Sequence, residues 1–383
     1  MNIGIDIRGL TIKSRTGIGN YIFNVLKNIS KLDKENNYYL LSSGSIKIKE
    51  SIVKQLEDIL KSNDNFHHIH LKVSNKILNL SLLLKTGPDL TKLFPVKLDL
   101  FWLPNINFYK FNNKIPILLT IHDLSFLHSK NFFSLKRKIW HYLVNVRQLV
   151  SKADKIISVS KNTRRDIIKF CLTNSAKIKV IYPGVDVIKI NQEKAKRITS
   201  GYNLKKKYYI YIGTLEPRKN ILSIIRGFDK YHKEYPETEL LIIGGKGWMY
   251  RDILKKIKHR TYIRHLGYID SLEEKAALYY LSQGLIWPSF YEGFGFPLLE
   301  ATYYNIPIIS SYKTSLPEII KNQSLYIDPF NSAEIYQMLK MLTEDKKLRK
   351  SLIISSKNFK IFNWSEQIKE IINYFKYVKK NSN

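Results

Sequence analysis

The sequence predicts an α/β protein with two domains, each built around a parallel β-sheet. Short runs of β-branched and aromatic residues alternate with segments of helical periodicity, which is the pattern of repeated β-α-β units. This alternation restarts after a polar, lysine-bearing stretch, and a chain of 383 residues is long enough for two cores. We therefore expect an N-terminal domain at residues 1–185, a linker at 186–206, a C-terminal domain at 207–360 and a final helical segment at 361–383.

The predicted strands form two series, one on each side of the linker. The spacers between them are long enough for crossover helices, so the strands within a series should be parallel. The first series comprises residues 3–7, 38–41, 98–103, 115–121, 155–159 and 178–182. The second series comprises residues 208–212, 240–243, 262–266, 284–287, 307–309 and 325–327.

Three helices of the C-terminal half are predicted from their residue patterns. The first has one apolar face at helical spacing, formed by Ile221, Ile224, Ile225, Phe228 and Tyr231. Capping-box spacing marks the start of two others, at Ser271 with Glu274 and at Asn363 with Glu366. The last helix must pack on another part of the protein, because it carries an apolar face formed by Ile368, Ile371, Ile372 and Phe375.

Composition favours a globular cytoplasmic protein. Hydrophobic residues make up 44% of the chain and charged residues 25%. No apolar run approaches the roughly 18 residues that a membrane-spanning helix needs, and Asp6 and Arg8 within the first apolar run argue against a signal peptide. Cys171 is the only cysteine, so no internal disulfide can form.

The chain is strongly basic. It has 63 Lys and Arg against 32 Asp and Glu, so its formal net charge is 63 − 32 = +31 with histidine neutral. Such a surface attracts nucleic acid, anionic lipid or phosphorylated small molecules without distinguishing among them.

The most specific segment is residues 291–300, which read Tyr-Glu-Gly-Phe-Gly-Phe-Pro-Leu-Leu-Glu directly after a predicted strand. A glycine-rich turn that leads into a helix exposes backbone NH groups, and the helix dipole favours an anion there. Gly293 and Gly295 leave room for a ligand, while Glu292 and Glu300 can accept hydrogen bonds from sugar hydroxyls. The alternative is a surface loop with two solvated glutamates.

A second candidate is residues 213–220, which read Gly-Thr-Leu-Glu-Pro-Arg-Lys-Asn, again between a strand and a helix. Arg218 and Lys219 would hold a diphosphate and offset its growing negative charge as it leaves. Glu216 could restrain either cation through an ion pair. A charged turn that caps a helix is the alternative.

Two weaker candidates lie in the N-terminal half. The loop after the first strand contains Gly17 and Gly19, which would let the backbone approach a ligand, but two such glycines are a weak signal and an ordinary flexible loop is the better default. His122 follows the predicted strand 115–121, at the strand end where ligands of open α/β sheets usually bind. A single histidine is more often structural, so this assignment rests on its location.

In this order, the four segments resemble those of the retaining GT-B glycosyltransferases of family 4, whose members include bacterial mannosyltransferases of surface-polysaccharide assembly. The similarity extends from Gly4 to the final helix, and the Glu-x7-Glu motif is its most specific part. The resemblance implies two Rossmann-like domains that face each other across a cleft, with a nucleotide-sugar donor between them. It also implies that the C-terminal helix crosses back to the N-terminal domain.

The resemblance implies roles for individual residues. Glu292 would lie near the transferred sugar, Glu300 at the ribose, and Lys219 and Arg218 at the diphosphate. His122 would complete the catalytic group with Glu292, Lys219 and Arg218. The segment 265–269 would border the base, through Tyr268 and Ile269. The other implied donor contacts are Gly17, Gly19, Gly213, Thr214, Gly293, Phe294, Gly295, Phe296, Pro297 and Leu298.

Two positions depart from common family patterns. Thr214 stands where many members have a phosphate-binding arginine, and Asn20 stands where an arginine often follows the glycines. The first departure leaves the exact phosphate contacts open, although Arg218 could take over this role.

The family pattern implies that the anomeric configuration is retained. The acceptor would attack on the face that the diphosphate leaves, and a diphosphate oxygen would take the acceptor proton, so no dedicated general base is required. The sequence has no Asp-x-Asp metal site in the expected cleft. We therefore expect no cofactor and no metal requirement, with fixed cations supplying the electrostatic stabilisation.

The resemblance favours GDP-mannose as the donor and a saccharide or lipid-linked molecule of cell-surface polysaccharide synthesis as the acceptor. A nucleotide-sugar epimerase of the same fold is an alternative, because it needs the same donor site but no acceptor. A nucleic-acid-binding protein is a further alternative suggested by the charge. Its basic residues are scattered and form no recognisable recognition module, so we expect no nucleic-acid partner.

Membrane attachment is suggested by residues 132–152, which mix large apolar residues with cations and could lie in an anionic interface. The apolar residues are Phe133, Leu135, Ile139, Trp140, Leu143 and Val146, and the cations are Lys136, Lys138, Arg137 and Arg147. A core-packed crossover helix is the alternative. The chain is thus expected in the cytoplasm, peripherally at the inner face of the membrane if this helix binds lipid.

Overall fold

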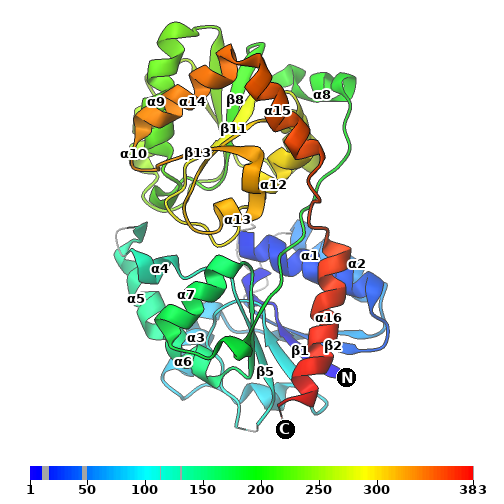
Figure 1. Cartoon of the computed structure of the whole chain (residues 1–383). Coiled ribbons are helices and arrows are strands. Elements are labelled where there is room, and N and C mark those ends of the chain that lie inside the picture. The colour runs from blue at the N-terminus through cyan, green and yellow to red at the C-terminus, as the bar shows by residue number, and fades with distance from the viewer. Residues whose placement is uncertain (11–16, 45–49, 113, 130–131, 383) are drawn as a thin grey trace. The chain divides into compact units, whose positions relative to one another are not determined.

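The computed structural model describes residues 1–10, 17–44, 50–112, 114–129 and 132–382. These residues form two compact units (Figure 1). The first unit consists of Met1–Leu124, Lys136–Gly184 and Phe362–Asn383, and the second consists of Ser125–Leu135 and Val185–Ile361. The C-terminal segment therefore belongs to the same unit as the N-terminus.

The first unit is built on a seven-stranded sheet with the strand order β3-β2-β1-β4-β5-β6-β7, and all its strand pairs are parallel. The strands are β1 (Asn2–Asp6), β2 (Asn37–Ser43), β3 (Phe66–Leu71), β4 (Leu100–Leu103), β5 (Ile117–Ile121), β6 (Lys155–Ser158) and β7 (Ile178–Val180). The helices are α1 (Gly17–Leu32), α2 (Glu50–Lys61), α3 (Asn75–Leu83), α5 (Leu135–Val144), α6 (Val146–Lys152), α7 (Lys161–Cys171) and α16 (Trp364–Lys380).

The second unit is built on a six-stranded parallel sheet with the order β10-β9-β8-β11-β12-β13. The strands are β8 (Lys207–Ile212), β9 (Thr238–Ile243), β10 (Ile263–Gly267), β11 (Gly284–Trp287), β12 (Ile308–Ser311) and β13 (Ser324–Ile327). The helices are α4 (Ser125–His128), α8 (Gln192–Thr199), α9 (Ile221–Glu234), α10 (Arg251–Ile257), α11 (Leu272–Tyr280), α12 (Phe296–Tyr303), α13 (Leu316–Ile320), α14 (Ser332–Glu344) and α15 (Lys346–Lys357).

The central strands are buried on both faces, which explains why they are continuous apolar runs in the sequence rather than alternating ones. Every residue of β4 and of β11 is buried. Burial of one such Leu or Ile side chain contributes roughly 1.5–3 kcal/mol to the free energy of folding. The prediction of two parallel, Rossmann-like sheets is confirmed.

The final helix, α16, returns to the first unit and packs on α1 and β4. The side chain of Asn363 caps it by accepting a hydrogen bond from the backbone nitrogen of Glu366 at 2.8 Å. Its predicted apolar face is buried, with Phe375 meeting Trp102 edge to face at 5.3 Å between ring centroids. Ile372, also predicted for this face, is only half-buried.

The structure differs from the sequence predictions in three places. Strand β3 was missed because its sequence, Phe-His-His-Ile-His-Leu, is rich in histidine and its edge position leaves His67 and His68 exposed. The stretch 186–206, expected as a linker, contains α8, which packs against α11 with Ala195 and Thr199 buried.

The predicted amphipathic segment 132–152 is also divided, because Asn145 adopts a left-handed conformation with φ of 45° and caps a new helix. The first part is α5 and the second is α6, which buries Val146, Leu149 and Val150. Within the part of the chain that the structure describes, no helix has the length and apolar character needed to cross a bilayer.

Candidate functional site

The candidate site of the second unit lies where the strand order of its sheet reverses. The chain leaves β8 for β9 on one side and later returns to the other side of β8 with β11. Ligands of open parallel sheets bind at the carboxyl ends of the strands at this point. The loops that follow β8 and β11 are the predicted segments 213–220 and 291–300.

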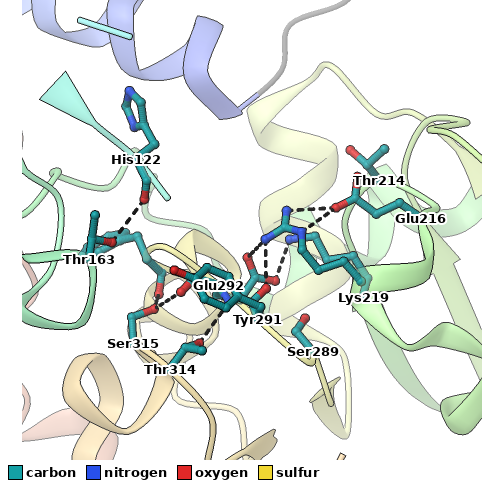
Figure 2. Close-up of polar contacts among 12 residues, drawn as sticks. His122, Thr163, Thr214, Glu216, Lys219, Ser289, Tyr291, Glu292, Thr314 and Ser315 are labelled. Atoms are coloured by element: carbon teal, nitrogen blue, oxygen red, sulfur yellow. Dashed lines mark hydrogen bonds and ion pairs between the residues drawn. The ribbon is translucent and has the colours of Figure 1, made fainter. Parts of the chain in front are cut away.

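Lys219 and Glu292 join these two loops. The Nζ atom of Lys219 donates to Oε1 of Glu292 at 2.6 Å, and Nη1 of Arg218 donates to Oε2 of Glu292 at 3.2 Å (Figure 2). Glu292 is 5% exposed and Lys219 is 9% exposed. Both residues were predicted at the site, but their pairing with each other was not predicted.

Arg218 is held from both sides. Its guanidinium group also contacts Oε1 of Glu216 at 2.8 Å and donates to the backbone oxygen of Tyr291 at 2.8 Å. The predicted restraint by Glu216 is therefore present. The cluster formed by Glu216, Arg218, Lys219 and Glu292 contains two anions and two cations, so its formal charges cancel.

Electrostatics keep Glu292 ionised. Burial alone would raise the pKa of its carboxyl group, but the charges of Lys219 and Arg218 outweigh this effect and hold the pKa below its ordinary value of 4.5. An ionised carboxylate accepts hydrogen bonds and donates none. Glu292 can thus bind hydroxyl groups and repels the phosphate groups that its cationic neighbours attract.

The backbone around Glu292 is fixed by the loop after β12. The nitrogen of Glu292 donates to Oγ1 of Thr314 at 3.0 Å, and Oγ of Ser315 donates to the backbone oxygens of Glu292 and Phe294 at 3.0 and 3.1 Å. Figure 2 shows these side chains pointing at the loop. Thr314 and Ser315 were not predicted, because no sequence motif marks a side chain that hydrogen-bonds to the backbone of a distant loop.

The turn into α12 depends on glycine. Gly295 has a φ of 109°, a backbone conformation that residues with a side chain rarely adopt, and it precedes the first helical residue, Phe296. Gly295 offers no side chain to cap α12, and Pro297 occupies the first turn, where its missing NH costs nothing. Gly293 and Leu298, the other predicted donor contacts here, are buried.

Glu300 projects from the second turn of α12 into contact with α11. Its Oε1 accepts from Nζ of Lys275 at 2.6 Å, and its Oε2 accepts from the hydroxyl of Tyr279 at 2.8 Å. Lys275 and Tyr279 are four residues apart and so lie on one face of α11. This spacing was visible in the sequence, but nothing in it identified Glu300 as the partner.

The loops after β8 and β9 meet backbone to backbone at Gly213 and Gly244. A Cβ atom at Gly244, whose φ is 150°, would lie 1.9 Å from the backbone oxygen of Gly213. Thr214 follows as an exposed residue. After β10, Tyr268 is exposed and Ile269 is half-buried, so both are accessible beside this pair of loops.

In the first unit, His122 lies directly after β5. Its Nε2 atom lies 2.8 Å from the backbone oxygen of Pro104, and its ring meets Tyr21 edge to face at 4.7 Å. Because a carbonyl oxygen only accepts, Nε2 carries the proton. Burial lowers the pKa of His122, so the imidazole is neutral near pH 7.

The two N-terminal glycines lie at the start of α1. Gly17 is exposed, with open space where a Cβ atom would be, whereas Gly19 is buried. Among the residues that the structure describes, no three His, Cys, Asp or Glu side chains are grouped so that they could hold a metal ion.

Comparison with known proteins gives matches along nearly the whole chain. The model of the family described as Glycosyltransferase Family 4 matches residues 17–189, and that of Glycosyl transferases group 1 matches residues 192–359. The O-antigen chain mannosyltransferase B of Escherichia coli is 27% identical over 94% of this chain and 96% of its own length. The O-antigen chain mannosyltransferase RfbU of Salmonella typhimurium is 26% identical over 60% of this chain and 65% of its own length.

A similar fold occurs among solved structures. The Anabaena protein HepE, in complex with UDP and glucose, superposes with a TM-score of 0.71 at 14% identity, covering 98% of this chain and 99% of that protein. At this identity the likeness concerns the fold alone.

Proposed function

Because the chain belongs to glycosyltransferase family 4, we propose that it transfers mannose from GDP-mannose to a saccharide or lipid-linked acceptor during synthesis of a cell-surface polysaccharide of O-antigen or capsule type. The names of the Escherichia coli and Salmonella typhimurium relatives support the choice of mannose as the transferred sugar and of O-antigen synthesis as the process. The observation that carries the proposal is the buried Lys219–Glu292 pair at the switch point of the second sheet.

The two residues of this pair bind different parts of the donor. Glu292, kept ionised, accepts hydrogen bonds from the hydroxyls of the transferred sugar. Lys219 and Arg218 turn toward the diphosphate and stabilise the charge that develops on it as it leaves. The bound donor thereby replaces part of the internal ion pairing of the cluster.

Glu300 is assigned to the ribose of the nucleotide. Each of its oxygens already accepts one hydrogen bond, from Lys275 and from Tyr279, and each has a further lone pair for a ribose hydroxyl. The two partners on α11 hold the carboxylate in a single orientation.

His122 is assigned to a sugar hydroxyl as a neutral group. Since its Nε2 proton is directed at Pro104, its Nδ1 atom is an acceptor. Such a residue positions a hydroxyl and cannot supply a positive charge to the diphosphate.

We propose that transfer retains the anomeric configuration. The bond between the anomeric carbon and the diphosphate oxygen breaks, and the acceptor oxygen bonds to that carbon on the same face. The acceptor proton passes to the departing diphosphate oxygen. Lys219 and Arg218 supply fixed positive charge, so the reaction should need no metal, and activity should survive EDTA.

The proposal is tested with the purified chain, a lipid-linked oligosaccharide acceptor and separate GDP-mannose, UDP-glucose and UDP-N-acetylglucosamine donors. We expect a mannosylated product with GDP-mannose alone, and an α-linkage from the α-configured donor. A new nucleotide sugar formed without acceptor would instead indicate an epimerase. Transfer from a UDP-sugar alone would overturn the choice of donor.

A further inference from the structure

Helix α5 turns its apolar side outward. Leu135, Ile139, Tyr142 and Leu143 are 73%, 50%, 83% and 40% exposed. They occupy positions i, i+4, i+7 and i+8, which form a single stripe about 100° wide along a helix. Val144, the buried residue of this helix, lies on the opposite side. A crossover helix packed in a core would bury this stripe instead.

Positive charges border the stripe on both sides. At about 100° per residue, Lys136 lies beside Leu143 on one edge and Lys138 lies beside Tyr142 on the other. Residues 124–153, which include α5, contain lysine and arginine but no aspartate or glutamate. The chain as a whole also has a positive net charge, of +31.

This combination fits a lipid surface with negative charge. An interfacial helix lies in the plane of the membrane, with its apolar stripe among the acyl chains and its lysines at the headgroups. Tyr142, the most exposed residue of the stripe, has the amphipathic ring that is enriched at membrane interfaces. Figure 1 shows α5 as a separate ribbon outside the strands of the first sheet.

We propose that α5 binds an anionic bilayer in this in-plane orientation and attaches the protein peripherally to the membrane. The attachment goes beyond the proposed sugar transfer and does not depend on it. Lipid binding is measured without donor or acceptor, so a negative result in either experiment leaves the other unaffected.

The test is flotation of the full chain with phosphatidylcholine vesicles, with and without phosphatidylglycerol. We expect binding to the anionic vesicles that weakens with added salt. The double variant Lys136→Ser/Lys138→Ser should lose about fivefold in partitioning for each lysine removed. Ile139→Asp/Tyr142→Ser should lose more than about tenfold, because it removes apolar area and adds a repelled charge.

Ile354→Asp is the matched control, because Ile354 is 48% exposed on α15, another lysine-rich helix, but has no outward stripe around it. It should bind like the wild type. Equal flotation of all variants would overturn the proposal. The proposal would also be overturned if Ile139→Asp/Tyr142→Ser abolished a dimer of the protein but left flotation unchanged. The stripe would then be an interface between two copies of the chain. Unchanged thermal unfolding would exclude misfolding as the cause.

Discussion

The ammonium group of Lys219 lies 2.6 Å from the carboxylate of Glu292, although 73 residues separate them in the chain. The contact joins the loops after β8 and β11, the two strands at which the order of the second sheet reverses. Both groups are shielded from solvent, so neither is easily rehydrated if its partner is lost. Function and local stability should therefore depend on the same two residues.

Substitution of Lys219 should lower both activity and stability. In Lys219→Met, we expect the rate of sugar transfer to fall by about 10²–10³, because one cation at the leaving group is lost. The free energy of unfolding should fall by about 1–3 kcal/mol, because Glu292 keeps Arg218 but loses a buried partner.

The double variant Lys219→Met/Glu292→Gln should recover part of that stability but none of the activity, as measured by urea unfolding and a transfer assay. Lys207→Met is the control, because Lys207 forms an exposed ion pair with Glu237. Its effect should stay below about 1 kcal/mol. If the effects of Lys219→Met and Glu292→Gln on the free energy of unfolding simply added in the double variant, the two side chains would not be energetically coupled.

Stability should depend on pH through Glu292. Its pKa in the folded protein lies below the ordinary value of 4.5, so its contribution is complete above pH 4.5 and is lost as the pH falls through the folded pKa. The difference in free energy of unfolding between wild type and Glu292→Gln should therefore shrink below pH 4.5. Unfolding titrations at several pH values measure it, and a difference that is constant with pH would exclude this mechanism.

Removal of the partners of Glu300 should weaken donor binding. In Tyr279→Phe and in Lys275→Met, we expect the KM for the donor to rise about tenfold, since hydrogen bonds to a charged group are worth about 1.5–3 kcal/mol. The value of kcat should change little, because the ribose lies away from the reacting bond. Steady-state kinetics with varied donor check this, and a fall in kcat at unchanged KM would refute the assignment.

Alanine at Gly244 should destabilise the second unit. The new Cβ atom would lie 1.9 Å from the oxygen of Gly213, and the φ of 150° is unfavourable for alanine. We expect a loss of roughly 2–4 kcal/mol in the free energy of unfolding. Gly201→Ala is the control, because nothing lies within 4 Å of its Cβ position. Thermal unfolding of both variants gives the comparison, and equal midpoints would be inconsistent with the close approach.

Much of the fold was predictable because parallel strands buried on both faces are apolar runs. The helix α9 was predicted from Ile221 to Tyr231, and all five residues of its predicted face are buried. Strand β3 was not predicted, because an edge strand with exposed histidines lacks that signal. Asn145, which divides 132–152 into two helices, was missed because asparagine occurs both inside helices and at their ends.

The site was predictable only in part. Strand-to-helix turns with glycine, proline and charged residues identified Glu292, Glu300 and Lys219 within their own segments. Their partners could not be predicted, because Ser315 and Tyr279 reach the site through packing of separate helices and loops. Such contacts depend on the register of elements that local sequence patterns do not specify.

The most direct test of the central claim is a calorimetric titration of guanosine, GDP and GDP-mannose into wild type, Lys219→Met and Glu292→Gln. We predict that GDP binds the wild type more tightly than guanosine does, and that this difference in affinity is lost in Lys219→Met. In Glu292→Gln, GDP should still bind more tightly than guanosine, but GDP-mannose should no longer bind more tightly than GDP. If both variants bind all three compounds as the wild type does, the Lys219–Glu292 pair does not hold the donor.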